Sequence, residues 1–136
     1  LLITIKNQKN QLEEIIKTWN QGTHRKSALQ ATIFNPYEDI SKAPRRGFPC
    51  LQQVVFVPEG SNGQEGLTIV GFYASQDCFS KAFGNYWGLY SLGKFVAEAM
   101  GIPFKSVCCI ASNYVLGSTK KNLKELYNAI VNIMKE

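Results

Sequence analysis

Hydrophobic and polar residues recur with two different periods along this chain, and the changes of period mark its expected elements. Between Leu12 and Trp19 the apolar residues recur every three or four positions, as on one face of a helix. Between Ser27 and Phe34 apolar and polar residues alternate, which is typical of a strand. The pattern therefore predicts a helix over 8–19 followed by a strand over 27–34.

Turn-forming residues separate these elements from the next ones. Pro36, Pro44 and their polar neighbours predict a long surface connection over 35–48, and connections of this length are often functional. Two β-rich segments, 50–57 and 67–73, are joined by a stretch rich in Gly and Asn and predict a hairpin. The remaining patterns predict a helix over 85–100, a strand over 105–111 and a helix over 119–134.

The elements follow one another in the order α-β-β-β-α-β-α, without an internal repeat. This order predicts an α+β fold in which a mixed β-sheet packs on helices. We expect Trp87, Tyr90 and Phe95 of the 85–100 helix to pack on that sheet. The 136 residues suffice for one domain, and the apolar start at Leu1, without Met, leads us to expect a piece of a longer chain.

Composition narrows the class of protein. Hydrophobic residues make up 45% of the chain and charged residues 18%, which is an ordinary globular mixture. The sequence contains no run of about 18 apolar residues and no signal peptide, so we expect a cytoplasmic protein. The four cysteines have no disulfide framework and should be free thiols. One histidine and no Cys-x-x-Cys pair lead us to expect no metal.

The net charge of +5 favours an anionic partner. The basic residues are scattered, and they cluster only at Arg25-Lys26, Arg45-Arg46 and Lys120-Lys121. A phosphate pocket therefore fits the sequence better than a nucleic-acid surface, which needs a continuous basic stripe.

Cys50 is the candidate nucleophile. It follows Arg45-Arg46-Gly47-Phe48-Pro49, where the long basic connection enters a strand. The two arginines would favour its thiolate, which is the form that attacks. A cysteine at the start of a strand is also commonly a small core residue, so Cys50 alone leaves both interpretations open.

The residues after the hairpin give Cys50 a context. Ala74-Ser75-Gln76-Asp77 follows the hairpin, and Asn85 lies eight residues further on. In these residues the sequence resembles thymidylate synthase, in which a strand-initial Pro-Cys-His carries the nucleophile and a hairpin precedes Gln-Arg-Ser-x-Asp and Pro-Phe-Asn. The corresponding residues here are Pro49-Cys50-Leu51, Ala74-Ser75-Gln76-Asp77 and Phe83-Gly84-Asn85. The resemblance extends more weakly to Asn10-Gln11-Leu12 and to Leu123-Lys124-Glu125-Leu126.

The resemblance implies a chemistry. Cys50 would add to C6 of a pyrimidine nucleotide, so that C5 can accept a one-carbon unit from 5,10-methylenetetrahydrofolate. Asn85 would orient the pyrimidine, Ser75 would donate to the phosphate, and Asp77 would contact the folate. All three residues could instead simply cap a turn or a helix.

The resemblance also implies a homodimer with sites built from both chains. Under this resemblance, Arg25 and Lys26 would reach the phosphate bound by the neighbouring subunit. Arg45 and Arg46 could belong to a solvated loop, although their position before Cys50 favours binding of an anionic ligand. Cys78, Cys108-Cys109, Tyr86 and Trp87 lie near these motifs, and we expect them to be core residues.

Departures from the family pattern leave a second hypothesis open. Ala74 replaces the phosphate-binding Arg, and Leu51 replaces the His after the nucleophile. Tyr114 and Leu116 replace the His and Tyr of an Asp-x-His-x-Tyr motif. The protein is therefore expected to be either a folate-dependent methyl- or hydroxymethyl-transferase or a non-catalytic, nucleotide-binding and dimerising relative. An RNA-binding domain is the least favoured alternative.

Overall fold

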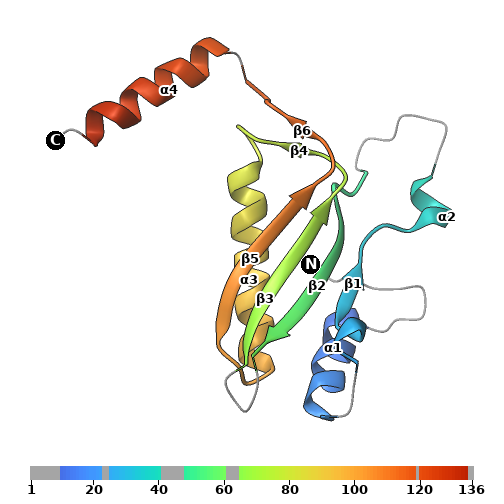
Figure 1. Ribbon diagram of the computed structural model, residues 1–136. Coiled ribbons are helices and arrows are strands. Elements are labelled where there is room, and N and C mark those ends of the chain that lie inside the picture. Colours follow the sequence, from blue (N-terminus) through green and yellow to red (C-terminus); the bar gives the residue numbers. More distant parts are fainter. Residues whose placement is uncertain (1–9, 23–24, 41–47, 61–64, 119, 135–136) are drawn as a thin grey trace.

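A mixed β-sheet is the centre of the fold. The computed structural model describes residues 10–22, 25–40, 48–60, 65–118 and 120–134. In this part of the chain the main sheet has the order β1-β2-β3-β5. Its strands are β1 (Gln30–Thr32), β2 (Leu51–Glu59), β3 (Gly66–Tyr73) and β5 (Phe104–Ala111). Strand β2 is antiparallel to both of its neighbours, β1 and β3, whereas β3 and β5 are parallel (Figure 1).

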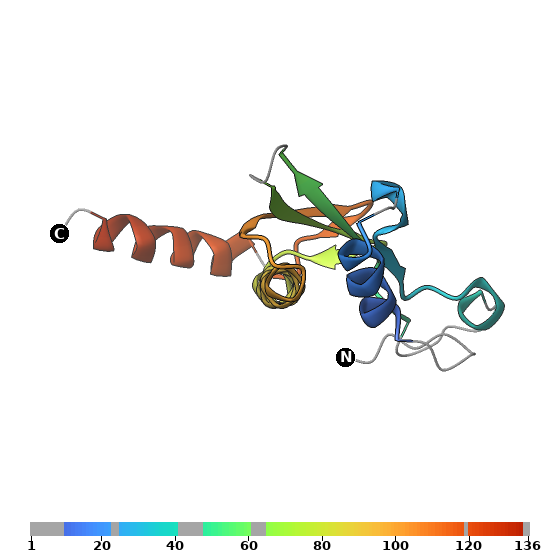
Figure 2. The same cartoon turned by 90° about the horizontal axis from the view of Figure 1, so that it is seen from below.

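Two helices cover one face of this sheet (Figure 2). They are α1 (Gln11–Asn20) and α3 (Ala82–Ala99). The Asn10 side chain caps α1 by accepting a hydrogen bond from the Leu12 backbone N–H, and such a cap stabilises the first turn. The indole N–H of Trp19 donates to the Met100 carbonyl at 2.9 Å and ties the end of α1 to the end of α3.

The core lies between these helices and the sheet. Helix α3 approaches the strands closely because two glycines stand at the contact. A Cβ on Gly71 would lie 2.6 Å from a Leu89 methyl group, and a Cβ on Gly93 would lie 2.6 Å from the Phe104 ring. The buried hydrophobic residues are Ile15, Leu29, Ala31, Val54, Phe56, Leu67, Ile69, Tyr73, Leu89, Val96, Ala97 and Met100.

Several shorter elements surround the sheet. A 3₁₀-helix, Lys26–Ala28, precedes β1, and the short helix α2 (Pro36–Asp39) follows it. Beyond the ends of β3 and β5 the chain forms a second, parallel pair, β4 (Gln76–Asp77) with β6 (Tyr114–Val115).

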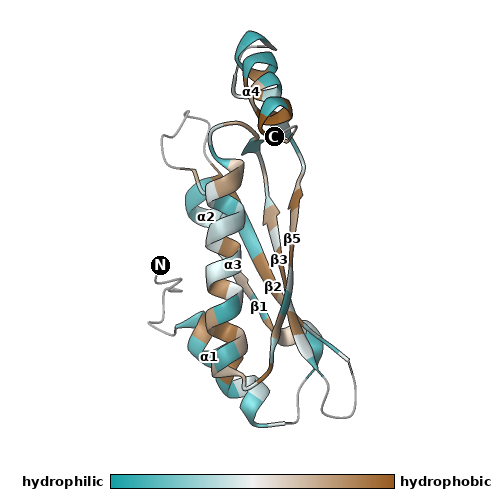
Figure 3. Ribbon diagram, turned by 90° about the vertical axis from the view of Figure 1, so that its left-hand side faces the viewer, coloured by the Kyte–Doolittle hydropathy of each residue, from teal (hydrophilic) through white to brown (hydrophobic). Residues whose placement is uncertain are grey.

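The last helix, α4 (Lys120–Ile133), extends away from the sheet (Figure 1). Figure 3 shows hydrophobic residues along it, beyond the end of the sheet. No helix in the described part of the chain is both long and apolar enough to cross a membrane.

The predicted α+β fold class and the hairpin of β2 and β3 are confirmed, but several boundaries were wrong. The predicted strand over 27–34 shrinks to Gln30–Thr32, because only these residues pair with β2. The predicted connection over 35–48 contains α2, and its residues 41–47 lie outside the described part. Helix α3 begins at Ala82, so Asn85 lies within the helix and does not cap it.

The predicted core role of several side chains near α3 was also wrong. Trp87 is 60% exposed and Phe95 is 58% exposed, because the side of α3 that faces the sheet carries mostly small residues. That side presents Leu89, Gly93, Val96 and Ala97. Tyr86, Cys78 and Cys108 are exposed as well, whereas Cys109 is half-buried and Tyr90 packs edge-on against Phe104.

Candidate active site at the end of the sheet

Antiparallel pairing brings Cys50 next to the segment that follows β3. Leu51 lies opposite Tyr73, and the Ala74 N–H donates to the Cys50 carbonyl at 2.9 Å. A β-bulge interrupts the pairing at this point, because Gln52 is an extra residue between two paired positions. Bulges of this kind often lie next to active sites, where they redirect a side chain.

The Gln52 carbonyl is itself an anchor. It accepts backbone N–H groups from Ile33 at 2.8 Å and from Phe34 at 3.2 Å, where the chain leaves β1. The bulge, and with it the start of β2 beside Cys50, is therefore held from both neighbouring strands.

Two adjoining clefts open at this end of the sheet. The smaller has a volume of about 270 Å³ and a partly polar lining, and the larger has a volume of about 400 Å³ and a mainly apolar lining. Cys50 and Asn85 line both. The smaller cleft is completed by Ser75, Gln76, Asp77, Lys81 and Val115, and the larger by Leu12, Leu51, Tyr73, Gly84, Gly88, Leu89 and Leu92.

The structure thus brings together four of the predicted site residues, Cys50, Ser75, Asp77 and Asn85. Cys50 is exposed, so the alternative interpretation of this thiol as a small core residue was wrong. The chemical roles assigned to the four residues stay predictions.

Asn85 belongs to a short polar chain that ends in the core. Its Nδ2 donates to Oε1 of Gln76 at 3.4 Å, and the Cys109 thiol donates to the same oxygen at 3.4 Å. Burial raises the pKa of the Cys109 thiol, so this thiol keeps the proton that it donates.

Ser75 is positioned by the segment that leads into β6. The Ser112 hydroxyl donates to the Ala74 carbonyl at 2.7 Å, and the Gln76 N–H donates to the Asn113 carbonyl at 2.9 Å. The Asn113 side-chain amide donates to the Ser75 hydroxyl at 3.5 Å. Because this hydroxyl accepts from Asn113, its own proton can still be donated to a ligand.

Asp77 holds the turn that leads into α3. Its Oδ1 accepts the Ser80 backbone N–H at 2.9 Å, and this hydrogen bond holds the pKa of the carboxyl below its usual range. Asp77 therefore caps a turn, as its alternative interpretation suggested, and it also presents an ionised carboxylate to the smaller cleft.

Three residues of the clefts were missed as candidates by sequence reasoning. Tyr73 lines the larger cleft, and burial raises the pKa of its hydroxyl to about 12, so the hydroxyl stays protonated. Gln76 and Lys81 line the smaller cleft. The available signal was position, because Tyr73 and Gln76 flank Ser75 within the family-like motif.

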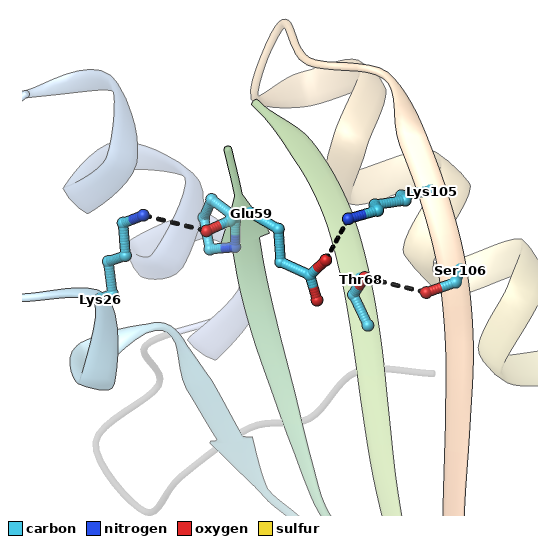
Figure 4. A network of polar contacts seen from close by, with 6 residues as sticks. Lys26, Glu59, Thr68, Lys105 and Ser106 are labelled. Carbon is cyan, nitrogen blue, oxygen red and sulfur yellow. Dashed lines mark hydrogen bonds and ion pairs between the residues drawn. The ribbon is translucent and has the colours of Figure 1, made fainter. Parts of the chain in front are cut away.

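Of the predicted cationic residues that the structure describes, Arg25 and Lys26 do not line these clefts. The Lys26 ammonium donates to the Pro58 carbonyl at 3.1 Å, near the opposite end of β2 (Figure 4). Arg25 precedes it, and Arg45 and Arg46 lie outside the described residues. A role for Arg25 and Lys26 in the site of a neighbouring subunit stays a prediction.

The cysteines are the remaining candidate ligands for a metal ion. Cys50, Cys78, Cys108 and Cys109 all carry free thiols. Among the described residues, no three or more His, Cys, Asp or Glu side chains are grouped so that they could hold a metal ion.

The fold and the clefts define a class, an α+β protein with a thiol-containing site at the end of a mixed sheet. No family model matches the chain. A Methanocaldococcus jannaschii protein named "Putative thymidylate synthase" is 33% identical over 97 residues, which are 70% of this chain and 41% of that protein. The solved structure of thermostable thymidylate synthase A from Bacillus subtilis matches 93% of this chain and 44% of its own, with a TM-score of 0.64 and 14% identity.

This chain is therefore similar in sequence to a putative archaeal thymidylate synthase and similar in fold to a bacterial thymidylate synthase. The similarity to the solved structure establishes the fold, and the similarity to the archaeal protein supplies the relationship in sequence. The chain spans less than half the length of either protein.

Proposed function

We propose that the protein transfers a one-carbon unit from 5,10-methylenetetrahydrofolate to C5 of a pyrimidine nucleotide, with Cys50 as the nucleophile. The observation that carries this proposal is the convergence of a thiol, an amide, a hydroxyl and a carboxylate on one cleft, from Cys50, Asn85, Ser75 and Asp77. A nucleophile acting beside groups that orient its substrate is the arrangement that covalent catalysis requires.

The Cys50 sulfur would form a bond to C6 of the pyrimidine ring. The electron pair of the C5–C6 double bond then moves towards C5 and makes that carbon nucleophilic. C5 would then form a carbon–carbon bond to the one-carbon unit, and loss of the C5 proton would allow the bond between that unit and the folate nitrogen to break. Addition of a hydride from the reduced folate, for a methyl product, or of water, for a hydroxymethyl product, would re-form the C5–C6 double bond and expel the Cys50 thiolate. The folate supplies the one-carbon unit when it is bound.

The polar residues of the smaller cleft fit a nucleotide. The Asn85 amide has its oxygen and one remaining N–H for the edge of the base, since its other N–H donates to Gln76. The Ser75 hydroxyl can donate to a phosphate oxygen. Lys81 supplies a positive charge in the same cleft, where Ala74 replaces the arginine of the family pattern.

The residues present also fit a folate. The larger cleft has leucine walls from Leu51, Leu89 and Leu92 that suit a flat heterocycle. Asp77 is ionised and could accept hydrogen bonds from ring N–H groups. Its carboxylate lies in the adjoining smaller cleft, which shares Cys50 and Asn85 with the larger one.

The decisive experiment traps the covalent step. The protein is incubated with a 5-fluoropyrimidine nucleotide and methylenetetrahydrofolate, and adducts are located by peptide mass spectrometry. We expect an adduct on Cys50, none on any cysteine of Cys50→Ser, and an unchanged yield for Cys78→Ser. Cys78 is a matched control because its thiol is exposed but belongs to neither cleft.

A second candidate function is a non-catalytic relative that binds nucleotides as a dimer. It is favoured by the sheet face opposite α1 and α3, where Phe72 and Ile110 are paired neighbours and both exposed. Binding of uridine or cytidine nucleotides without any Cys50 adduct would establish this alternative. We propose a homodimer in either case, and sedimentation of Ile110→Glu against the wild type tests it.

A further inference from the structure

Gln76 combines near-complete burial with an unused donor. Gln76 is only 2% exposed, and its Oε1 accepts hydrogen bonds from both Asn85 and Cys109. Its Nε2 is buried and has no hydrogen-bond partner among the described residues. The residue also lines the smaller cleft, beside Cys50 and Asn85.

Buried donors in folded proteins are almost always paired, so an unpaired one beside a cleft requires an explanation. The surrounding hydrogen bonds prevent a simple rotation of the amide. If Gln76 were turned over, its NH₂ group would face two donors, the Cys109 thiol and the Asn85 amide. The contacts therefore hold Oε1 towards the protein and leave Nε2 for another partner.

The same contacts fix the orientation of Asn85. Because its Nδ2 is bound to Gln76, the alternative orientation would set the Asn85 oxygen against Oε1, and two acceptors repel. The proton of the Cys109 thiol thus fixes the orientation of the Gln76 amide, and the Gln76 amide fixes the orientation of the Asn85 amide.

We propose that Gln76 is a specificity-determining residue of this site, which fixes the Asn85 amide and donates through Nε2 to a carbonyl oxygen of the pyrimidine. This inference rests on the proposed function, because it assumes that a pyrimidine occupies the cleft. Uracil offers a ring N–H to the Asn85 oxygen and a neighbouring carbonyl to Gln76. Cytosine has an amino group in place of that carbonyl, so two donors would meet.

The test compares the affinities for uridine and cytidine 5′-monophosphates, in their ribo and deoxy forms, by titration calorimetry. The wild type should favour uridine nucleotides on the order of tenfold or more, as expected for one hydrogen bond gained and one donor clash avoided. Gln76→Met has similar volume but no polar atoms, and its ratio should fall to about one.

Three further variants separate specificity from a structural role. Cys109→Ser keeps a donor to Oε1 and should keep the preference, whereas Cys109→Ala should reduce it. Gln53→Met is the matched control, since it makes the same substitution on β2 away from both clefts. Thermal unfolding shows that each variant is folded before its ratio is compared.

Binding is measured without reaction, so the ratio tests Gln76 whether or not Cys50 forms an adduct. An unchanged ratio in folded Gln76→Met would overturn this inference and leave the proposed catalysis standing. A wild-type ratio near one would also overturn it. A clear preference that disappears in Gln76→Met, in a protein that forms no Cys50 adduct, would support Gln76 and refute the catalysis.

Discussion

The two ends of the main sheet use polar residues in opposite ways. At the end where β2 finishes, Glu59 pairs with Lys105, the Thr68 hydroxyl bonds the Ser106 hydroxyl at 2.9 Å, and Lys26 donates to a backbone carbonyl (Figure 4). At the other end, polar residues line two clefts, and one buried amide nitrogen has no partner among the described residues. At the first end these polar groups bind one another, whereas at the second end polar side chains face the two clefts.

Strand geometry explains the difference. Thr68 and Ser106 are register partners on adjacent parallel strands, so their side chains meet without any further structure. At the end that carries the clefts, the pairing of β3 with β5 stops and resumes as β4 with β6. The interruption leaves Ser75 and its neighbours outside a regular ladder, where they can face a cleft.

A substitution at Gly93 of α3 should have the largest effect on stability. Gly93 lies against Phe104 and Ile69 at the end where β2 finishes, and an added Cβ would approach their side chains to 2.6 and 2.9 Å. Gly93→Ala should lower the free energy of unfolding by about 1–3 kcal/mol, because both neighbours are packed in the core. Urea denaturation measures the change, and a neutral result would show that this end has unexpected room.

Two glycines with similar positive φ angles lie at opposite ends of the sheet and differ in their surroundings. Gly117 has a φ of 71°, and a Cβ there would lie 1.9 Å from the Asp77 carboxylate. Gly101 has a φ of 69° at the other end, with nothing within 4 Å. Both alanine variants should lose about 1 kcal/mol through backbone strain. Only Gly117→Ala should also displace Asp77. Under the proposed function, titrations should therefore show weaker binding of methylenetetrahydrofolate by Gly117→Ala and unchanged binding by Gly101→Ala.

Substitution of Gly88 should change the free energy of unfolding in the opposite direction. It lies within α3 and lines the larger cleft, and a Cβ there would have open space. Gly88→Ala should raise the free energy of unfolding by about 0.5–1 kcal/mol, since glycine weakens a helix. The bulkier Gly88→Leu should fill the cleft and weaken ligand binding without loss of stability. A drop in stability for Gly88→Ala would mean that the helix is already constrained there.

The smallest effects concern the two carboxylates. The hydrogen bond from Lys105 lowers the pKa of Glu59, and the hydrogen bond from the Ser80 backbone N–H lowers the pKa of Asp77. Each contributes stability that is present above its ordinary pKa and is lost as the pH falls through the lowered value. Glu59→Gln and Asp77→Asn should each flatten the acid limb of stability against pH. Added salt should weaken the Glu59 contribution more, because it depends on an exposed ion pair.

Much of the fold could be predicted because its main elements carry clear periods. The hairpin, α1 and α3 follow from spacing, whereas β4 and β6 have two residues each and are too short for a period to appear. The outward direction of Trp87 and Phe95 could not be predicted, because α3 is apolar on most sides. Only tertiary contact showed that its small residues, including Gly93, face the sheet.

The grouping of the candidate residues could be predicted where it follows a motif, but not where it depends on burial. Cys50, Ser75, Asp77 and Asn85 were selected through a resemblance, and the fold brings them together. Gln76 fills an unspecified position of that motif, so nothing in the sequence indicates that its amide would be buried with a donor that has no partner among the described residues. The position of Lys26 at the far end of β2 likewise follows from strand register.

The bulge at Gln52 also changes how relatives of this site can be recognised. Because of the extra residue, Leu51 and Val54 lie opposite Tyr73 and Gly71, on the same side of the sheet although they are three positions apart. A regular strand would place such a pair on opposite sides. The bulge therefore changes the spacing of apolar residues directly after Pro-Cys, which is first three positions and then two. This spacing can be searched for in sequences that are too divergent to keep the motifs.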